Sequence, residues 1–440
     1  MDDTPRTALV LALRNVVEHN PAVVYKTVFL GETVDLVERR PGWRCETIDF
    51  DIDDVSLTAL TARLLARPEA ILLWAEAHHA RLAIQIGDLV RKISPDSPIL
   101  VFGRGATFLP QLFGAAPFHA AHAYGDREAT VTAFLDNIEA PAGPVIGTVA
   151  IDGNGAVSRT PGRWLTPEAW PLPALDRLPL DRYRAFTERV HGPEYSKRIS
   201  VTVSKGCGLG CAYCGATEQE GRTDRRRDLE VLFNWFERAE VARRDSLIHL
   251  YASDLFADPA WIAAFSETYR ARSSGFGWRG VTTTRTLQDE ATVRAAGLNG
   301  CRELAVGIEH VSADRHSSVK STLAEIERAA ALTRRYGITL KGLVMIGYPG
   351  QKERDIEYLE DLADDWRITL RYTGYTPLHR LRGLSRETLL GMNLEQYDRR
   401  TFFDPEATTI NPAFFFGRLT TDGGYHRPPP RDAAGEAVAA

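Results

Sequence analysis

Short apolar runs alternate with helical patterns through the first 140 residues. Between the runs, apolar residues recur three and four positions apart, which is typical of amphipathic helices. Strands that alternate with helices predict an α/β fold with a parallel, doubly wound (Rossmann-like) sheet. Such a sheet binds its ligands at the carboxyl ends of its strands. The predicted strands are Thr7–Leu13, Cys45–Phe50, Ala70–Trp74, Pro98–Phe102 and Ala121–Tyr124, and the predicted helices include Leu57–Leu65, Arg81–Ile93 and a segment that ends near Ile138.

A second alternation of strands and helices covers residues 198 to about 380. Its six strands and the helices between them predict an open (β/α)6 partial barrel, whose active face lies at the carboxyl ends of the strands. Thr322-Leu-Ala-Glu325 is a capping box, and Gly337 is placed to end the helix that begins there. The predicted strands are Arg198–Val203, Leu247–Tyr251, Trp278–Thr282, Arg302–Gly307, Thr339–Ile346 and Thr369–Tyr375; the predicted helices are Leu229–Ala242, Ala260–Ala271, Glu290–Ala296, Leu323–Tyr336 and Glu353–Trp366.

Proline and glycine mark the segments that flank the predicted barrel. Residues 141–197 are a proline-rich linker in which Asp152-Gly-Asn-Gly155 predicts a hairpin turn. Residues 381–440 predict a short C-terminal cap, with a helix over Arg386–Tyr397 and a disordered end after Tyr425. An aromatic segment of this cap either covers the barrel mouth or packs against the barrel base; it consists of Phe402, Phe403, Phe414, Phe415 and Phe416. The predicted domains are therefore 1–140, 198–380 and 381–440, with the linker 141–197 between the first two.

The strongest chemical signal is Cys207-Gly-Leu-Gly-Cys211-Ala-Tyr-Cys214, directly after the first predicted strand of the barrel. Three thiols in a glycine-rich turn can surround one small object, and iron–sulfur clusters are held by cysteine thiolates, usually four. Three ligands would leave one iron of a 4Fe–4S cluster open to a small molecule. Zinc is the alternative, but a structural zinc site usually takes four protein ligands, and the sequence has no second cysteine pair.

Composition narrows the class of protein. The chain has 440 residues, of which 44% are hydrophobic and 25% charged, and this predicts a soluble globular protein of two or three domains. Its formal net charge of −5 argues against a nucleic-acid partner. No apolar run is long enough for a membrane span and the acidic start has no signal core, so we expect a cytoplasmic protein. The isolated Cys45 and Cys301 are expected to be buried packing residues.

The cysteine loop resembles the signature of the radical S-adenosylmethionine (SAM) enzymes. The resemblance implies that Cys207, Cys211 and Cys214 hold a 4Fe–4S cluster, whose open iron takes the amino and carboxylate groups of SAM. Tyr213 would lie beside the adenine of SAM. An electron, supplied by a donor such as flavodoxin or ferredoxin, would cleave SAM and yield a 5′-deoxyadenosyl radical that abstracts hydrogen from the substrate.

Weaker matches to this family stand where the later strands end. Asp254 follows the second strand, where family members contact the SAM amino group, and Glu309 resembles a glutamate that meets the ribose. Arg285 either binds a carboxylate of SAM or substrate or forms a surface salt bridge. Taken singly, each match could be an ordinary strand-end turn. The residues assigned to SAM binding are Tyr213, Gly215, Ser253, Asp254, Arg285, Glu309, Gly347 and Pro349.

The first 140 residues resemble the cobalamin-binding domain that precedes the barrel in the class B methyltransferase type of radical SAM protein. The segments 102–107 and 125–128 carry the resemblance, which implies cobalamin contacts at Gly103, Gly105, Thr107, Gly125 and Glu128. The Asp-x-His-x-x-Gly motif, which supplies the lower histidine ligand in many cobalamin proteins, does not occur in this region. His78 and His79 follow the third predicted strand, where they either line the ligand cleft or are solvated loop residues, and we expect the latter.

The resemblance implies methyl transfer to an unactivated carbon of a small molecule or peptide. SAM would serve twice, to methylate cobalamin and to generate the radical. The first alternative is a cobalamin-independent radical SAM enzyme that rearranges, dehydrogenates, decarboxylates or joins its substrate. The second is a non-catalytic iron–sulfur protein, which failure to cleave SAM would support. The Arg- and Ala-rich composition associates the chain with natural-product biosynthesis, but the sequence predicts neither the substrate nor the catalytic residues.

Overall fold

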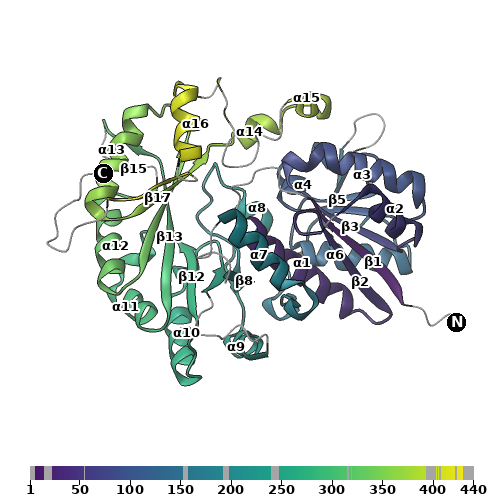
Figure 1. Ribbon diagram of the computed structural model, residues 1–440, viewed down its shortest axis with the longest axis horizontal. Coiled ribbons are helices and arrows are strands. Elements are labelled where there is room, and N and C mark those ends of the chain that lie inside the picture. Colours follow the sequence, from purple (N-terminus) through teal and green to yellow (C-terminus); the bar gives the residue numbers. More distant parts are fainter. Residues whose placement is uncertain are drawn as a thin grey trace. The chain divides into compact units, whose positions relative to one another are not determined.

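A computed structural model gives the architecture of the chain (Figure 1). It describes residues 5–13, 22–53, 55–151, 157–191, 198–238, 247–314, 317–318, 320–392, 403, 405, 408–421 and 424–429. The chain divides into two compact units, the first formed by Met1–Asp228 with Pro377–Asp398 and the second by Leu229–Thr376 with Arg399–Ala440. No helix among the described residues is long and apolar enough to cross a membrane. The domain boundaries predicted from the sequence, near residues 140, 198 and 380, stay a prediction.

The first unit is built on a sheet of the order β2-β1-β3-β4-β5-β6-β7. The first five strands run parallel, as the sequence predicts, and their apolar runs are buried on both faces. β6 and β7 pair antiparallel at the edge and confirm the predicted hairpin, although its turn residues 152–155 lie outside the described residues. The strands are β1 (Arg6–Ala12), β2 (Trp43–Asp49), β3 (Ala70–Trp74), β4 (Ile99–Phe102), β5 (Ala120–His122), β6 (Thr148–Ile151) and β7 (Val157–Arg159).

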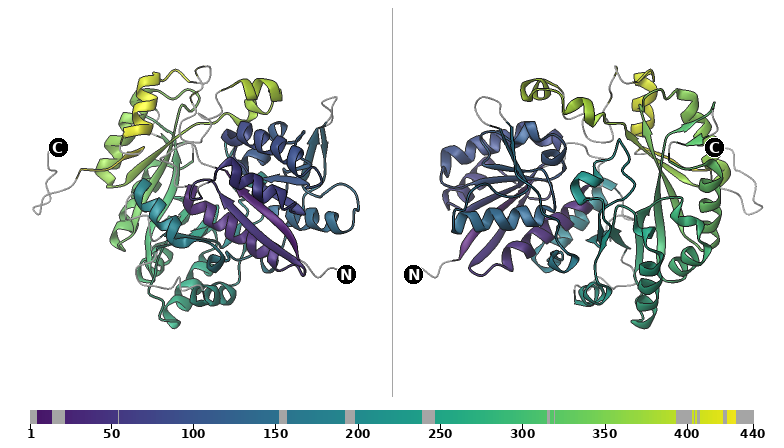
Figure 2. Two further views of the ribbon diagram at one scale, coloured as in Figure 1. Left: turned by 45° about the vertical axis from the view of Figure 1, so that its right-hand side comes forward. Right: turned by 180° about the vertical axis from the view of Figure 1, so that it is seen from behind.

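Helices cover both faces of this sheet (Figure 2). One face packs against α1 and α6 in a single hydrophobic core that includes Val10, Leu72, Leu100, Val37 and Phe134. Helix α1 is not predicted by the sequence, because most of it from Val28 to Val37 is buried and shows no polar stripe. The helices are α1 (Ala22–Glu38), α2 (Leu57–Leu65), η1 (Ala77–His79), α3 (Ala80–Ile93), α4 (Arg104–Phe108), α5 (Pro110–Phe113) and α6 (Arg127–Glu139).

The rest of the first unit carries the cysteine loop. The chain passes through η2 (Pro167–Ala169), η3 (Leu175–Arg177) and α7 (Leu180–His191) into strand β8 (Arg198–Thr202). A small antiparallel sheet of β9 (Ser204–Lys205) and β10 (Arg225–Arg226) then encloses the loop and α8 (Ala216–Glu220). The helices α14 (Leu378–Leu381) and α15 (Arg386–Gly391) also belong to this unit. The remainder of the helix predicted to reach Tyr397 lies outside the described residues.

In the second unit the strands follow the order β18-β17-β16-β13-β12-β11. Five of them are parallel, as predicted, and β18 pairs antiparallel with β17, which the sequence does not predict. The strands are β11 (Leu247–Tyr251), β12 (Gly277–Thr282), β13 (Cys301–Glu309), β16 (Thr339–Ile346), β17 (Thr369–Gly374) and β18 (Tyr425–His426). A separate pair, β14 (Val311–Ser312) and β15 (Ser317–Ser318), follows β13.

Helices α10 to α13 line one side of this sheet (Figure 1). The predicted capping box at Thr322 is formed, since the Thr322 side chain accepts from the Glu325 N–H and the Glu325 carboxylate accepts from the Thr322 N–H. The helices are α9 (Leu229–Arg238), η5 (Leu255–Ala257), α10 (Pro259–Ala271), η6 (Thr286–Gln288), α11 (Glu290–Leu298), α12 (Leu323–Arg335), α13 (Glu353–Trp366) and α16 (Pro412–Thr420). Residues 239–242 of the predicted first helix and the end after 429 lie outside the described residues.

Candidate functional site

The cysteine loop is tied together at its two ends. Lys205 pairs with Arg225 and Ser204 with Arg226 in the β9–β10 ladder. The Cys207 N–H donates to the Gly221 carbonyl over 3.0 Å, and the Ser204 hydroxyl donates to Asp224 over 2.6 Å. The loop from 206 to 221 is therefore closed by backbone and side-chain bonds, so that its shape is set by the hairpin.

Gly206 opens this loop, and we predict that its replacement by alanine prevents cluster assembly. Its φ is +104°, and an added Cβ would lie 1.9 Å from the Thr223 carbonyl oxygen, so an L side chain forces the hairpin apart. Gly208→Ala is the matched control, because its nearest neighbour would be 3.8 Å away. Iron and sulfide per chain after anaerobic reconstitution should fall severalfold in Gly206→Ala alone. Equal iron and sulfide contents in both variants would refute the prediction that cluster assembly needs the closed loop.

The donor set of the loop fits an iron–sulfur cluster in number and kind. Cys207 and Cys211 are half-buried and Cys214 is exposed, all within eight residues of one closed loop. In the described part of the chain, however, no three His, Cys, Asp or Glu side chains gather closely enough to hold a metal ion. Assignment of the three cysteines as cluster ligands therefore rests on their spacing and stays a prediction.

The two isolated cysteines have a different environment. Cys301 is fully buried and Cys45 half-buried, and burial raises the pKa of both thiols above the usual range. A thiol that stays protonated is a poor metal ligand or nucleophile. Both residues therefore fit the packing role that the sequence predicts.

The end of the cysteine loop is held by the first unit's own helices. Gly215 is buried, and an added Cβ would lie 2.0 Å from the Phe108 ring of α4. Arg382, which follows α14, donates to the Phe108 carbonyl over 2.9 Å and pairs with Glu218 of α8. Tyr213, two residues before Gly215 in the sequence, is half-buried. The residue after the last cysteine is thus fixed by packing, whereas its predicted role in SAM binding stays untested.

Two of the predicted cobalamin residues belong to an acidic turn that is bonded to the cysteine hairpin. Glu128 is 1% exposed and accepts from the Lys205 ammonium over 2.7 Å. Asp126, also 1% exposed, pairs with the Arg225 guanidinium through bonds of 2.6 and 3.1 Å. Gly125 precedes them at φ +80°. The turn that follows β5 therefore anchors both strands of the hairpin, and its proposed contact with cobalamin stays a prediction.

Charges around this anchor shift two carboxyl groups in opposite directions. Burial alone would raise the pKa of Glu128, but the Lys205 ammonium and the Arg127 guanidinium together hold it well below its usual range. Glu32 of α1 pairs with Arg127 too, yet burial raises its pKa. Glu128 is thus held in its ionised form, and its carboxylate neutralises the Lys205 ammonium that directly precedes the cysteine loop.

The other predicted cobalamin residues lie where β4 ends. Gly103 and Gly105 pack against the turn after β3, and a Cβ on Gly105 would lie 2.4 Å from the Glu76 carbonyl carbon. Thr107 is buried, and its hydroxyl donates to the Gly103 carbonyl over 3.3 Å. Glycine at 105 is therefore required by the close approach of α4 to the neighbouring turn.

The expectation of solvated histidines at the end of β3 is wrong. His78 is 8% exposed and His79 is 1% exposed. The two rings lie 4.0 Å apart, the His79 ring meets Trp74 edge-on, and His79 Nδ1 accepts from the Glu76 N–H over 3.0 Å. A one-turn helix at this strand end turns both side chains inward, which composition cannot reveal.

The second unit brings several predicted residues to the carboxyl edge of its sheet. Asp254, 8% exposed, accepts from the Thr282 hydroxyl over 2.6 Å and more weakly from the Thr283 hydroxyl. The predicted ends of β11 and β12 are therefore bonded to each other. Ser253 lies beside Asp254 in the same turn, and Arg285 is exposed one residue before η6.

Glu309 ends β13 in a strained conformation. Its φ is +66°, and the register with β16 shifts between Gly307 and Glu309, so this residue sits in a β-bulge. The carboxylate folds back over Gly307 and lies 3.4 Å from the Lys320 ammonium. Bulges and positive φ in residues other than glycine gather at functional sites, where they re-aim a side chain.

We predict that Glu309→Gly is more stable than Glu309→Gln, although both variants remove this carboxylate. Both lose the contact with Lys320, but glycine relieves a left-handed conformation that glutamine must keep, a difference of about 1 kcal/mol. Both should bind SAM more weakly than the parent in equilibrium dialysis if the carboxylate meets the ligand. Denaturant unfolding measures the stability difference, and a glutamine variant as stable as the glycine variant would contradict the strain.

Gln351 holds the glycine–proline turn that follows β16, and the sequence analysis missed it. This fully buried side chain accepts from the Gly347 N–H over 2.8 Å and donates to the Met345 carbonyl over 2.9 Å. Its amide also lies 3.2 Å from His310 Nδ1, next to Glu309. Pro349 is exposed at the tip of the turn. The place of Gln351 directly after the Gly-x-Pro-Gly string is the one local signal that could have indicated this residue.

The aromatic segment of the cap lies beside this turn. Phe403, Phe415 and Phe416 form a cluster with ring centroids 5.0 to 5.9 Å apart. A Cβ on Gly347 would lie 3.3 Å from the Phe415 ring, so the cluster stands at the carboxyl end of β16. Phe402 lies outside the described residues. Of the two positions predicted for the aromatic segment, this cluster therefore occupies the one at the carboxyl ends of the strands, not the one at the barrel base.

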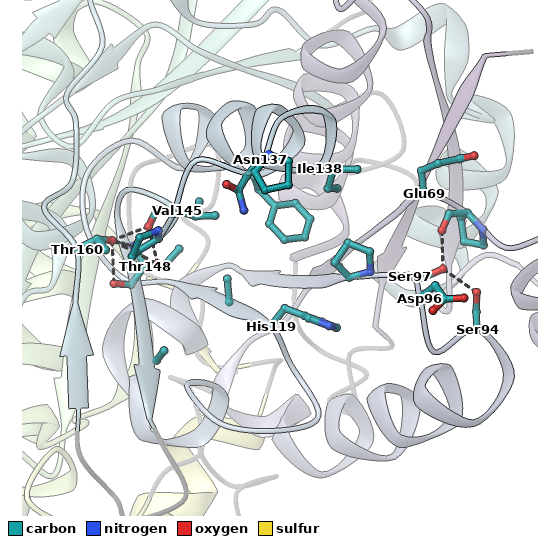
Figure 3. Close-up of a pocket in the computed structure, with 18 of the residues that line it drawn as sticks. Glu69, Ser94, Asp96, Ser97, His119, Asn137, Ile138, Val145, Thr148 and Thr160 are labelled. Carbon is teal, nitrogen blue, oxygen red and sulfur yellow. Dashed lines mark hydrogen bonds between the residues drawn. The ribbon is translucent and has the colours of Figure 1, made fainter. Parts of the chain in front are cut away.

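A pocket of about 630 Å³ in the first unit does not coincide with these residues (Figure 3). It lies where β3, β4 and β5 begin, at the edge opposite to Gly103 and Gly125. Its polar lining is bonded internally, as between Ser94 and Ser97 over 2.6 Å and from Thr160 to the Val145 carbonyl over 2.6 Å. The pocket therefore offers few unused polar groups to a ligand.

Two sheets with mainly parallel strands define an α/β protein, and a closed loop with three cysteines follows the first strand of the predicted barrel. Residues 201–363 match the model of the Radical SAM superfamily, so this part of the chain is similar to the radical SAM enzymes. This family implies a 4Fe–4S cluster and SAM, as the sequence predicts.

Relatives and solved structures extend the likeness beyond that region. An uncharacterized methyltransferase of Pyrococcus horikoshii, PH0819, is 22% identical over 85% of this chain and 76% of its own. The methyltransferase TsrM from Kitasatospora setae, solved with tryptophan substrate and a SAM analog, has a TM-score of 0.66 at 16% identity over 95% of this chain and 88% of its own. The cobalamin-dependent enzyme OxsB, solved with aqua-cobalamin, has a TM-score of 0.67 at 16% identity over 82% of this chain. This chain spans 52% of the OxsB chain.

Proposed function

We propose that this chain is a cobalamin-dependent radical SAM methyltransferase that acts on an unactivated carbon of a small molecule or peptide. The observation that carries the proposal is the extent of the fold likeness, which reaches 95% of the chain with TsrM and so includes the first sheet as well as the radical SAM region. A curated relative described as a methyltransferase supports the same reaction class. The fold is shared at low identity, so the substrate does not transfer with it.

The residues of the chain would act as ligands and as positioning groups. Cys207, Cys211 and Cys214 would hold the cluster, and Asp254 and Glu309 would bind the polar groups of SAM. When bound, the cluster supplies the electron that cleaves SAM, and cobalamin carries the methyl group. We propose a small reduced protein such as flavodoxin or ferredoxin as the electron donor. The remaining task of the chain is to orient the ligands and exclude water from a radical.

One observation favours a second candidate, a radical SAM enzyme without cobalamin. Glu128 and Gly105, two of the proposed cobalamin contacts, already have internal roles, one in a buried ion pair and one in backbone packing. The first unit would then serve as a platform for the cysteine loop. Rearrangement, dehydrogenation, decarboxylation or bond formation would follow from the radical alone.

The visible absorption spectrum of the anaerobically reconstituted protein separates these candidates. The protein is expressed with cobalamin available and is desalted before measurement. Retained cobalamin bands beside the cluster absorption, at one cobalamin per chain, support the methyltransferase. Cluster absorption with 5′-deoxyadenosine formation but no retained cobalamin would overturn it and leave the second candidate.

A further inference from the structure

The described helices of the second unit cover one face of its sheet and leave the other face without a helix. Tyr372 donates to Glu360 of α13, and His426 lies 2.8 Å from Asp364 of the same helix, so these two residues mark the helical face. Alternate residues of a strand point to opposite faces. Arg371 and its register partner Tyr425 therefore point to the other face, which we call the inner face.

A layer of charged side chains crosses this inner face. Glu303 of β13 accepts from the Arg279 guanidinium of β12 over 2.9 Å and from the Lys341 ammonium of β16 over 2.7 Å. The Lys341 ammonium also lies 5.6 Å from the centre of the Tyr425 ring. These side chains are only 11 to 15% exposed. One carboxylate thus serves two cations, and its two oxygens are both occupied.

Arg371 adds a third cation to this layer. Leu343 is its register partner in β16, so Arg371 lies diagonally across from Lys341 on the same face. Its Nε is buried without a hydrogen-bond partner among the described residues. The layer therefore carries more positive than negative charge, although the whole chain has a formal net charge of −5. A buried donor atom without an acceptor is costly, and an anion bound at this Nε would offset that cost.

We propose that the inner face of this sheet binds an anionic group, a carboxylate or a phosphate, through Arg371 with Lys341 beside it. The planar guanidinium fork can donate two parallel hydrogen bonds to such a group. As a substrate anchor, this inference rests on the proposed function. Arg371 lies three residues before the end of β17, which places the anchor about 10 Å from the carboxyl edge at ~3.3 Å per residue. Remote anchors of this kind orient the reacting part of a substrate.

The test measures thermal unfolding of the full chain in inorganic phosphate, in acetate and in chloride at equal ionic strength. The variants are Arg371→Met, which removes the fork, and Arg371→Lys, which keeps the charge without it. Arg294→Met is the matched control, because Arg294 is an exposed residue of the helical layer. Saturating anion should raise the midpoint of the parent and of Arg294→Met by about 2–4 °C over chloride.

Arg371→Met should lose this shift, and Arg371→Lys should keep a smaller one. A shift with phosphate alone indicates a phosphorylated substrate, and a shift with acetate alone indicates a carboxylate. An equal shift in all four proteins, or no shift in any, would overturn the proposal, because a general salt effect does not depend on Arg371. The test needs no cluster, SAM or cobalamin, so failure of the proposed methyl transfer would leave its result intact.

Discussion

Replacement of Cys211 by alanine should abolish the visible absorption of the reconstituted protein and its ability to form 5′-deoxyadenosine from SAM. Two thiolates cannot hold the cluster that the radical SAM family requires, and the described part of the chain has no fourth cysteine near the loop to substitute. Cys207→Ala and Cys214→Ala should give the same complete loss. The three effects should not add, because the ligands act as one unit.

Cys45 and Cys301 provide matched controls for this result. Both are cysteines outside the loop, and burial keeps their pKa above the usual range, so neither supplies a thiolate at neutral pH. Cys45→Ala and Cys301→Ala should therefore retain the full cluster absorption. Iron, sulfide and 5′-deoxyadenosine are measured in the same preparations. Cluster retention in Cys211→Ala, or its loss in Cys301→Ala, would contradict the assignment of the ligands.

Local patterns gave the strands and the cysteine loop. Buried parallel strands are short apolar runs, so Ala70–Trp74 and Thr339–Ile346 could be placed almost to the residue. The signature Cys207 to Cys214 depends on spacing along one loop and could be recognised without a fold. Helix α1 was missed for the converse reason, since a helix buried on nearly all sides shows no polar stripe.

Long-range pairing is what the sequence could not supply. Glu128 and Lys205 stand 77 positions apart, and no pattern in either segment announces their bond. The bond between the Gln351 amide and His310 at the neighbouring strand end, and the inward turn of His78 and His79, are likewise invisible in local patterns. The letters of the acidic turn at 125–128 predict a ligand site, which stays a prediction, whereas the structure shows an internal role for this turn.

The bond between Glu128 and Lys205 leads to the prediction with the largest expected effect on stability. Glu128→Gln should lower the free energy of unfolding by about 3–5 kcal/mol, because it removes the nearer of the two carboxylates from the buried Lys205 ammonium and leaves only Asp126, 3.8 Å away. Glu32→Gln is the matched control. Glu32 is buried to the same degree and also pairs with Arg127, but burial raises its pKa, so loss of its charge should cost much less.

The pH dependence separates this effect from simple loss of packing. The folded-state pKa of Glu128 lies well below the ordinary value of 4.5, so its stabilisation is complete above that value and is lost as the pH falls below it. The gap between the parent and Glu128→Gln in denaturant unfolding should therefore shrink in acid. In the double variant Glu128→Gln/Lys205→Met most of the stability should return, since the buried ammonium that loses its closest carboxylate is removed as well. Equal losses in Glu128→Gln and Glu32→Gln, with a gap that does not change with pH, would show that the ion pair does not hold the cysteine hairpin in place.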